Sequence, residues 1–342
     1  MSLATSFGVV WGTGVLAAII LTPMTRRLAT RWGIMDLPGE PRRVHRHPVP
    51  RLGGLALYAS FLLAVAVSLF LPIARQDPNE STRLTGLIIG STLAVLIGLW
   101  DDRRPLGPWP QLGAQVGVAL VGIYFLLFIE VTTNPFTGKQ VWFPWPVTLA
   151  VTLFWVLGMM NTVNWLDGLD GLADGVVAIT CAILFLHMWR LGQHSVALLP
   201  LALLGVTIGF LPANFHPARL FMGSSGSMFL GFAISALSIM AGAKLATALL
   251  VMGIPILDVA WQIVSRLRRG VSPMEADRGH LHHRLYDLGM SQRRVVLIYY
   301  AVCAGAGVLA LVLPSPVDKL FALLILGGLG LLLLASLARR RN

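Results

Sequence analysis

The residues best suited to chemistry lie in one stretch, residues 161–175, which reads NTVNWLDGLDGLADG. It holds three carboxylates, two carboxamides and three glycines in a chain that is otherwise mostly apolar. Oxygen ligands of this kind suit Mg²⁺, which commonly takes one or two protein ligands together with substrate phosphates. Acidic groups beside a membrane core are costly and are usually functional. We therefore expect the chemistry to centre on this stretch.

The spacing within the stretch limits how many side chains can share one ion. Four of the polar residues recur every third position: Asn161, Asn164, Asp167 and Asp170. Three residues of α-helix turn by about 300°, so successive members drift by about 60° around a regular helix. Gly168 and Gly171 would let the chain unwind. We expect a loop or broken turn in which only some members are ligands.

A second acidic site, Asp101-Asp102, directly follows the uncharged run 84–100. The negative end of a helix dipole disfavours carboxylates, so the pair is placed against local preference. Two adjacent carboxylates can hold Mg²⁺ or divide into one ionised and one protonated acid. The alternative is a solvated helix end paired with Arg103 and Arg104. We favour the functional interpretation.

Two loops carry basic residues that suit phosphate. In the first, four prolines stiffen residues 38–54, which include His45, Arg46 and Arg51 and end in Gly53-Gly54. Basic groups before a helix N-terminus suit an anion. An Arg cluster that only sets membrane topology and lies on lipid headgroups is an equal alternative.

The second basic loop contains His280, His282, His283 and Arg284. Three histidines suggest zinc, but no Cys or spaced acid completes a familiar zinc pattern. We favour phosphate recognition, with a zinc site or a basic loop on the membrane surface as alternatives.

Two further features stay open from the residues alone. The small residues that follow Gly223, namely Ser224 to Ser227, permit close helix packing or leave room for a substrate. Asp258 stands alone in the apolar run 245–263, three residues after Pro255. Buried intramembrane acids are usually paired and functional, and a kinked helix could bring this one to the edge of a site.

The elements that must position these residues are membrane helices. The chain has 342 residues, of which 56% are hydrophobic and 12% charged, whereas soluble domains carry about 25% charged residues. Apolar runs long enough to cross about 30 Å of hydrocarbon recur throughout. We predict an all-α integral membrane protein of about eleven transmembrane helices, at residues 3–24, 52–73, 84–100, 111–129, 147–160, 173–189, 197–212, 225–241, 245–263, 295–313 and 318–337.

The charge distribution predicts the orientation. The net charge is +11, and 20 of the 26 Lys and Arg residues fall in alternate loops on one side, the bias typical of the cytoplasmic face. This placement argues against nucleic acid as the partner. We expect the N-terminus outside and the C-terminus in the cytoplasm. The first apolar run lacks a preceding positive region, so we interpret it as a span rather than a cleaved signal peptide. Cys181 and Cys303 lie in apolar runs and are expected to be packing residues.

The predicted loops differ sharply between the two sides. Stretch 130–146 is expected to be an outer loop with a small hairpin. Nearly every unusual polar residue falls in five inner loops: 25–51, 101–110, 161–172, 213–224 and 264–294. We therefore expect residues 1–342 to form a single polytopic domain with one cytoplasm-facing active site. A transporter for a phosphate-bearing solute is the alternative, but no internal repeat is visible.

Five motifs together resemble one family, and the resemblance covers almost the whole chain. They are PVPRLGG at 48–54, Asp101-Asp102, NxxNxxDGxDGL at 161–172, FMGxxGSMFLG at 221–231 and HLHHRL at 280–285. The sequence resembles the polyprenyl-phosphate N-acetylhexosamine-1-phosphate transferases (glycosyltransferase family 4). It is more similar to the WecA/TagO branch than to the MraY branch, because of the form of the last motif and its Asp277-Arg278-Gly279 lead-in.

The resemblance implies transfer of a sugar phosphate at the cytoplasmic face of the bacterial inner membrane. The expected reaction moves GlcNAc-1-phosphate from UDP-GlcNAc to undecaprenyl phosphate and releases UMP, for cell-wall, teichoic-acid or lipopolysaccharide synthesis. It implies Mg²⁺, with Mn²⁺ as a possible substitute, and a homodimer as a possible assembly. MurNAc-pentapeptide-phosphate transfer is the alternative within the family.

The resemblance also implies residue roles. Asn164 would be a metal ligand, with Asp167 and Asp170 supporting the nucleotide site. Asp101 and Asp102 would position or deprotonate the lipid phosphate. The remaining substrate-binding residues would be His45, Arg46 and Arg51 for lipid phosphate, Asn161, and His280, His282, His283 and Arg284 for the sugar or diphosphate.

One position departs from the family pattern. The family reads Gly-Asp-x-Gly-Ser, with that Asp as a principal Mg²⁺ ligand, and here Ser224 takes its place. A neutral hydroxyl is a poor ligand for a hard cation. We expect weak metal binding and an impaired or inactive enzyme, or else a catalytically inactive homologue that binds lipid phosphate.

Overall fold

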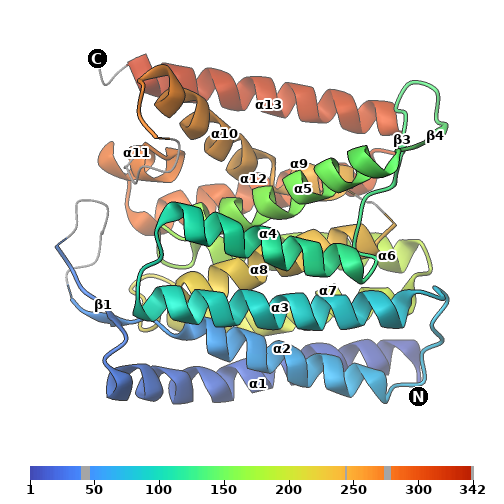
Figure 1. Cartoon of the computed structure of the whole chain (residues 1–342), viewed down its shortest axis with the longest axis horizontal. Helices are drawn as coiled ribbons and strands as arrows, with labels where there is room; N and C mark the ends of the chain where they lie inside the picture. The colour runs from blue at the N-terminus through green and yellow to red at the C-terminus, as the bar shows by residue number, and fades with distance from the viewer. Residues whose placement is uncertain (40–46, 243–244, 273–278, 340–342) are drawn as a thin grey trace.

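The computed structural model describes residues 1–39, 47–242, 245–272 and 279–339 as a bundle of long helices. Figure 1 shows most of the helices running along one common direction. The first seven helices are α1 (Leu3–Trp32), α2 (Gly53–Leu69), α3 (Glu80–Arg103), α4 (Pro108–Tyr124), α5 (Trp145–Leu166), α6 (Leu172–Arg190) and α7 (His194–Asn214). The others are α8 (Gly223–Met240), α9 (Leu245–Val251), α10 (Gly253–Arg268), α11 (Leu281–Asp287), α12 (Gln292–Val312) and α13 (Pro316–Arg339).

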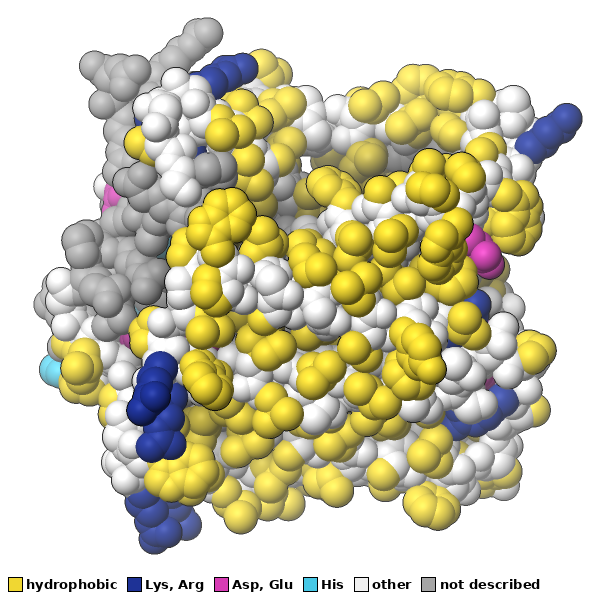
Figure 2. All heavy atoms as spheres, in the orientation of Figure 1, with side chains coloured by type: hydrophobic (Ala, Val, Ile, Leu, Met, Phe, Trp, Pro, Cys, Tyr) yellow, Lys and Arg dark blue, Asp and Glu magenta, His cyan; other side chains and the backbone are white. Residues whose placement is uncertain are grey.

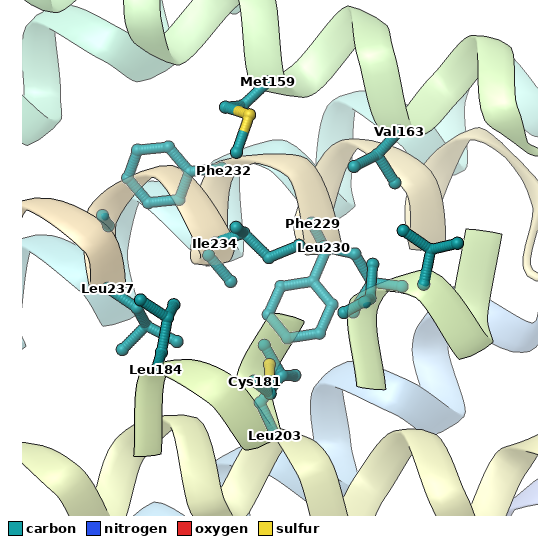
Figure 3. Close-up of a cluster of buried hydrophobic side chains, with 14 of the residues drawn as sticks. Met159, Val163, Cys181, Leu184, Leu203, Phe229, Leu230, Phe232, Ile234 and Leu237 are labelled. Atoms are coloured by element: carbon teal, nitrogen blue, oxygen red, sulfur yellow. The ribbon is translucent and has the colours of Figure 1, made fainter. Parts of the chain in front are cut away.

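Helix α8 forms the centre of the bundle, and every residue of it is buried. Its side chains pack against α5, α6 and α7, and Figure 3 shows Leu237 of α8 beside Leu184 of α6. Small residues predominate in its first turn, so neighbouring backbones approach closely there. The centre of the fold therefore carries Ser224 at its start.

The outer helices face the membrane. Among the residues that the structure describes, eight helices are long and apolar enough to cross it, and α9 with α10 adds a ninth candidate that is bent by 76°. Only 17% of the apolar window of α13 is buried, against 100% for α8. Figure 2 shows hydrophobic side chains covering the middle of one face, with Lys and Arg near its ends. The prediction of an all-α integral membrane protein is confirmed, whereas the predicted number of eleven spans stays a prediction.

Most predicted segments begin or end within a few residues of the observed helices, but three helices reach further into the predicted inner loops. Helix α3 continues to Arg103, which places Asp101 and Asp102 in its last turn. Helix α5 continues to Leu166, so Asn161 and Asn164 are helical, and the predicted broken turn is confined to residues 167–171. Helix α1 runs to Trp32.

Two small antiparallel sheets lie at opposite ends of the bundle. Strands β3 (Val131–Thr133) and β4 (Gln140–Trp142) form the predicted hairpin at the end where the chain starts (Figure 1). Strands β1 (Met35–Asp36) and β2 (Val49–Pro50) pair at the other end. There, residues 50–54 also pair with residues 221–222, through hydrogen bonds such as Gly54 N to Met222 O at 2.8 Å. This pairing brings the first and fourth predicted inner loops together.

Candidate active site

Ser224 lies at the meeting point of three segments. Its hydroxyl donates to Oδ2 of Asp101 at 2.5 Å and accepts from Nη2 of Arg51 at 3.0 Å. The second oxygen of Asp101 accepts from the backbone of Leu106 at 2.7 Å. A serine between a carboxylate and a guanidinium thus completes a hydrogen-bonded chain of opposite charges.

Asp102 caps the start of α8 from a neighbouring helix. Its two oxygens accept from the backbone nitrogens of Ser224 at 2.7 Å and Ser225 at 3.1 Å, and from the Ser225 hydroxyl at 2.7 Å. The first amides of a helix have no partner within it, and a negative charge suits its positive end. Asp102 is fully buried and pairs with Nε of Arg51 at 2.9 Å. Asp102 therefore holds the start of α8 and the guanidinium of Arg51 in place.

Arg51 is the cation of the cluster. Burial acts to lower the pKa of Arg51, but the carboxylates of Asp102, Asp36 and Asp101, and that of Asp167, outweigh burial and raise it. Asp36 lies 3.7 Å from Nη1. The guanidinium therefore stays charged and neutralises part of the acidic cluster at the start of α8.

Asn164 reaches the same helix turn from α5. Its amide donates to the Ser227 hydroxyl at 2.9 Å, and that hydroxyl donates to the carbonyl of Ser224 at 3.3 Å. The two residues that the family pattern assigns to the metal are thus linked through Ser227.

The broken turn that follows α5 is tied to the 213–222 segment. Asp170 accepts from the ring of His216 at 2.8 Å and from the backbone of Ala218 at 3.0 Å, while Asn214 accepts from Gly171 N at 3.0 Å. Asp167 ends α5 and is half-buried, and desolvation raises its pKa well above the ordinary value.

The histidine segment packs against this turn. A Cβ at Gly168 would lie 2.5 Å from Nε2 of His282 and 3.0 Å from Nε2 of His283, so only glycine fits. His282 is fully buried, and within the described residues neither ring nitrogen has a hydrogen-bond partner. Burial, followed by the charges of His283 and His280, lowers the pKa of His282 well below 6.5. The ring is therefore neutral at neutral pH.

The other predicted site residues do not contact the cluster around Ser224 or lie outside the described residues. Asn161 bonds Gln115 of α4 at 2.8 Å and Leu157 O at 2.8 Å, so its amide joins two helices. Arg284 belongs to α11 beside the histidines, and its Nε donates to Gly279 O. His45 and Arg46 lie outside the described residues, as does the Asp277-Arg278 lead-in.

Sequence reasoning did not single out three members of the site, Asp36, Asn214 and His216. Ser225 and Ser227 lie in the 221–231 motif, but that motif does not predict their partners Asp102 and Asn164. Asn214 and His216 had one weak signal, since they are the polar residues just before Pro217 in a predicted inner loop.

The residues present fit Mg²⁺ poorly. Within the described part of the chain, no three His, Cys, Asp or Glu side chains gather as a metal site. The Ser224 hydroxyl brings no charge and is already engaged by Asp101 and by the guanidinium of Arg51. A cation 3.0 Å from this oxygen opposes the binding of a second cation there.

Comparison with known proteins identifies the class. The family model for glycosyl transferase family 4 matches residues 84–242. A probable undecaprenyl-phosphate N-acetylglucosaminyl 1-phosphate transferase of Bacillus subtilis is 32% identical over 88% of this chain and 83% of its own length. A decaprenyl-phosphate N-acetylglucosaminephosphotransferase of Mycolicibacterium smegmatis is 36% identical over 84% of this chain and 78% of its own.

A third relative bears on the donor sugar. A phospho-N-acetylmuramoyl-pentapeptide-transferase of Oceanobacillus iheyensis is 32% identical over 84% of this chain and 90% of its own length.

The chain belongs to glycosyl transferase family 4, in the group of polyprenyl-phosphate sugar-phosphate transferases. It is a phosphoglycosyltransferase by family and a multi-pass protein of the bacterial inner membrane.

Proposed function

We propose that this chain is built to transfer GlcNAc-1-phosphate from UDP-GlcNAc to undecaprenyl phosphate, with release of UMP. The observation that carries the proposal is the gathering of Arg51, Asp101, Asp102 and Asn164 around the start of α8. The histidine segment packs against the neighbouring Asp167-Gly168 turn. The names of the relatives support a polyprenyl phosphate acceptor, and two of the three support GlcNAc.

The reaction is a direct displacement at phosphorus. An oxygen of the polyprenyl phosphate attacks the β-phosphorus of the UDP-sugar, the bond from that phosphorus to UMP breaks, and UMP leaves with the electron pair. Both substrates are anionic, so positioning and charge neutralisation supply most of the catalysis. Arg51 supplies a cationic group for the lipid phosphate, and the histidine segment with Arg284 supplies cationic or hydrogen-bonding groups for the diphosphate of the UDP-sugar.

A covalent aspartyl-phosphate route is less well supported. Among the described residues, every partner of Asp102 is a donor, and the carboxylate is fully buried, so it is poorly placed to attack. Each oxygen of Asp101 is also engaged. A trapped phospho-enzyme, or UMP formed from UDP-GlcNAc without lipid acceptor, would overturn the direct route.

Ser224 makes the chain an impaired member of its family. The Mg²⁺ or Mn²⁺ expected at Asn164 and position 224 binds weakly, because a hydroxyl replaces the carboxylate. An inactive homologue that binds lipid phosphate is the second candidate, favoured by the Ser224 hydroxyl being satisfied within the protein.

The whole chain, residues 1–342, acts as one polytopic domain with eleven spans, its N-terminus outside and its C-terminus cytoplasmic. Helices α2 and α4 have 17 residues each, a length of about 26 Å that nearly crosses the hydrocarbon layer. The site would then face the cytoplasm through loops 25–51, 101–110, 161–172, 213–224 and 264–294. A homodimer stays a prediction.

A donor panel on the Ser224→Asp variant tests the proposal. Purified variant with undecaprenyl phosphate and Mg²⁺ should release UMP from UDP-GlcNAc faster than from UDP-MurNAc-pentapeptide. A preference for the pentapeptide donor would assign the chain to the other branch. Lipid-phosphate binding without UMP release from any donor would support the inactive homologue.

A further inference from the structure

We infer that Asp258 is a positioning residue for His280. Oδ2 of Asp258 lies 3.0 Å from Nδ1 of His280, and both side chains are buried. The other oxygen accepts from the backbone of Leu281 at 2.9 Å, in the first turn of α11. A carboxylate at Nδ1 of a neutral imidazole keeps the proton on that nitrogen and fixes the ring orientation. The lone pair is then on Nε2.

The polar face of α10 supports this contact. The buried residues of α10 are Pro255, Asp258, Gln262 and Arg266, whereas Val264 and Leu267 are exposed. Residues four apart share one face of a helix, so the three polar side chains form a single row. Gln262 donates to the carbonyl of Gly279. The helix turns a polar stripe inward against the histidine segment and an apolar stripe toward the membrane.

Aromatic contacts hold the His280 ring on its other sides. The ring meets Trp165 in an edge contact at 5.5 Å and stacks on His282 at 5.6 Å with an angle of 12°. Arg266 lies over Trp165 at 5.2 Å from the ring centre. Trp165 follows Asn164, so the ring is fixed relative to the helix end that carries the candidate metal-binding amide.

His280 differs from His282 in a way that suits contact with a ligand. Both nitrogens of His282 are fully buried without a partner among the described residues. In His280 only Nδ1 is engaged by protein within that part of the chain, and Nε2 is not among the fully buried atoms. The geometry therefore presents Nε2 of His280 to the donor substrate. This inference rests on the proposed function only for that last step.

Nitrogen-15 NMR of histidine-labelled protein tests the contact without any need for activity. In the chain as it exists, His280 should show a proton on Nδ1, identified by the signals that His280→Gln removes. Asp258→Asn keeps an oxygen for the Leu281 amide but turns an NH₂ toward the ring, so the proton should move to Nε2. Asp77→Asn, at the opposite end of the bundle, should leave the signals unchanged. An unchanged tautomer in Asp258→Asn would overturn the inference.

Kinetics then test the positioning role in the Ser224→Asp background. Asp258→Asn should lower kcat by about 10- to 100-fold, the effect of removing such carboxylates from functional histidines at metal sites, with KM for UDP-GlcNAc nearly unchanged. Asp258→Glu should recover part of kcat. An unchanged kcat contradicts the positioning role. If Ser224→Asp itself releases no UMP, the proposed function fails, while the NMR result still decides the Asp258–His280 contact.

Discussion

At the scale of single residues, Ser224 is the position where this site departs from the family pattern. Ser224 is placed where two carboxylates, Asp101 and Asp102, meet the guanidinium of Arg51. A third carboxylate there would leave excess negative charge that only a cation could balance. The neutral serine hydroxyl instead links the Asp101 carboxylate to the Arg51 guanidinium through hydrogen bonds and adds no negative charge. Stability and metal binding are therefore opposed at this position.

His282 predicts a loss of stability in acid. Burial lowers its pKa in the folded protein, whereas the unfolded ring takes up a proton near pH 6.5. Its stability contribution is therefore complete above about pH 6.5 and falls as the pH drops below it, by at most about 1.4 kcal/mol per pH unit.

Unfolding midpoints of detergent-solubilised protein at pH 7.5 and 5.5 measure this effect. His282→Gln should lose less stability between the two pH values than the parent, because glutamine does not titrate. His47→Gln changes an exposed histidine and should behave like the parent. Equal losses in the parent and His282→Gln would show that this ring is not the source.

At the scale of elements, the start of α8 depends on the end of α3. Asp102 caps α8, and one turn earlier Gly98 lets the two backbones touch. A Cβ on Gly98 would lie 2.3 Å from Cα of Ser225, and this clash with a backbone atom cannot be relieved by rotating a side chain. The glycine and the cap therefore act together.

Gly98→Ala should separate α3 from α8 and weaken the Asp102 cap. We expect a loss of about 1–3 kcal/mol, typical of overpacking, seen as a lower unfolding midpoint. Gly113→Ala in α4 is the matched control, because no atom lies within 4 Å of its Cβ position. That change should be neutral or slightly stabilising. Equal stability of the two variants would refute the close-contact role of Gly98.

The sequence predicted the positions of helices and strands better than the side-chain contacts between them. The lengths of the apolar runs predicted where most of the helices lie, and turn residues predicted the β3–β4 hairpin. The three-residue spacing correctly predicted a break after α5. It did not predict that Asn161 would contact Gln115, 46 residues away in the chain. Likewise, no local pattern pairs Asp170 with His216 or bends α9 against α10 by 76°. Such contacts depend on packing between helices distant in the chain.

At the scale of the whole molecule, the residues of the candidate site gather at one end of an apolar bundle. Figure 1 shows β1 and α11 at that end, opposite the β3–β4 hairpin and the N-terminus. The concentration of unusual polar residues in five predicted inner loops predicted this gathering, and the family resemblance supports the same single site. The charge bias alone predicted only which end faces the cytoplasm.

Cysteine labelling checks this orientation. Cys181 and Cys303 are buried, so a membrane-impermeant maleimide should report only added cysteines. Thr137→Cys in the hairpin should react in intact spheroplasts, and Arg104→Cys after α3 should react only once the membrane is opened. The opposite pattern would reverse the proposed topology.

We infer that Ser224 alone separates this chain from an active transferase. The most direct test is UMP release by the parent and by Ser224→Asp, with UDP-GlcNAc, undecaprenyl phosphate and a Mg²⁺ titration. We predict that the aspartate variant releases UMP well above the parent and that Mg²⁺ raises its unfolding midpoint, since a ligand bound only by the folded state stabilises it. Equal, low rates for both forms, with no stabilisation by Mg²⁺, would contradict this role of Ser224.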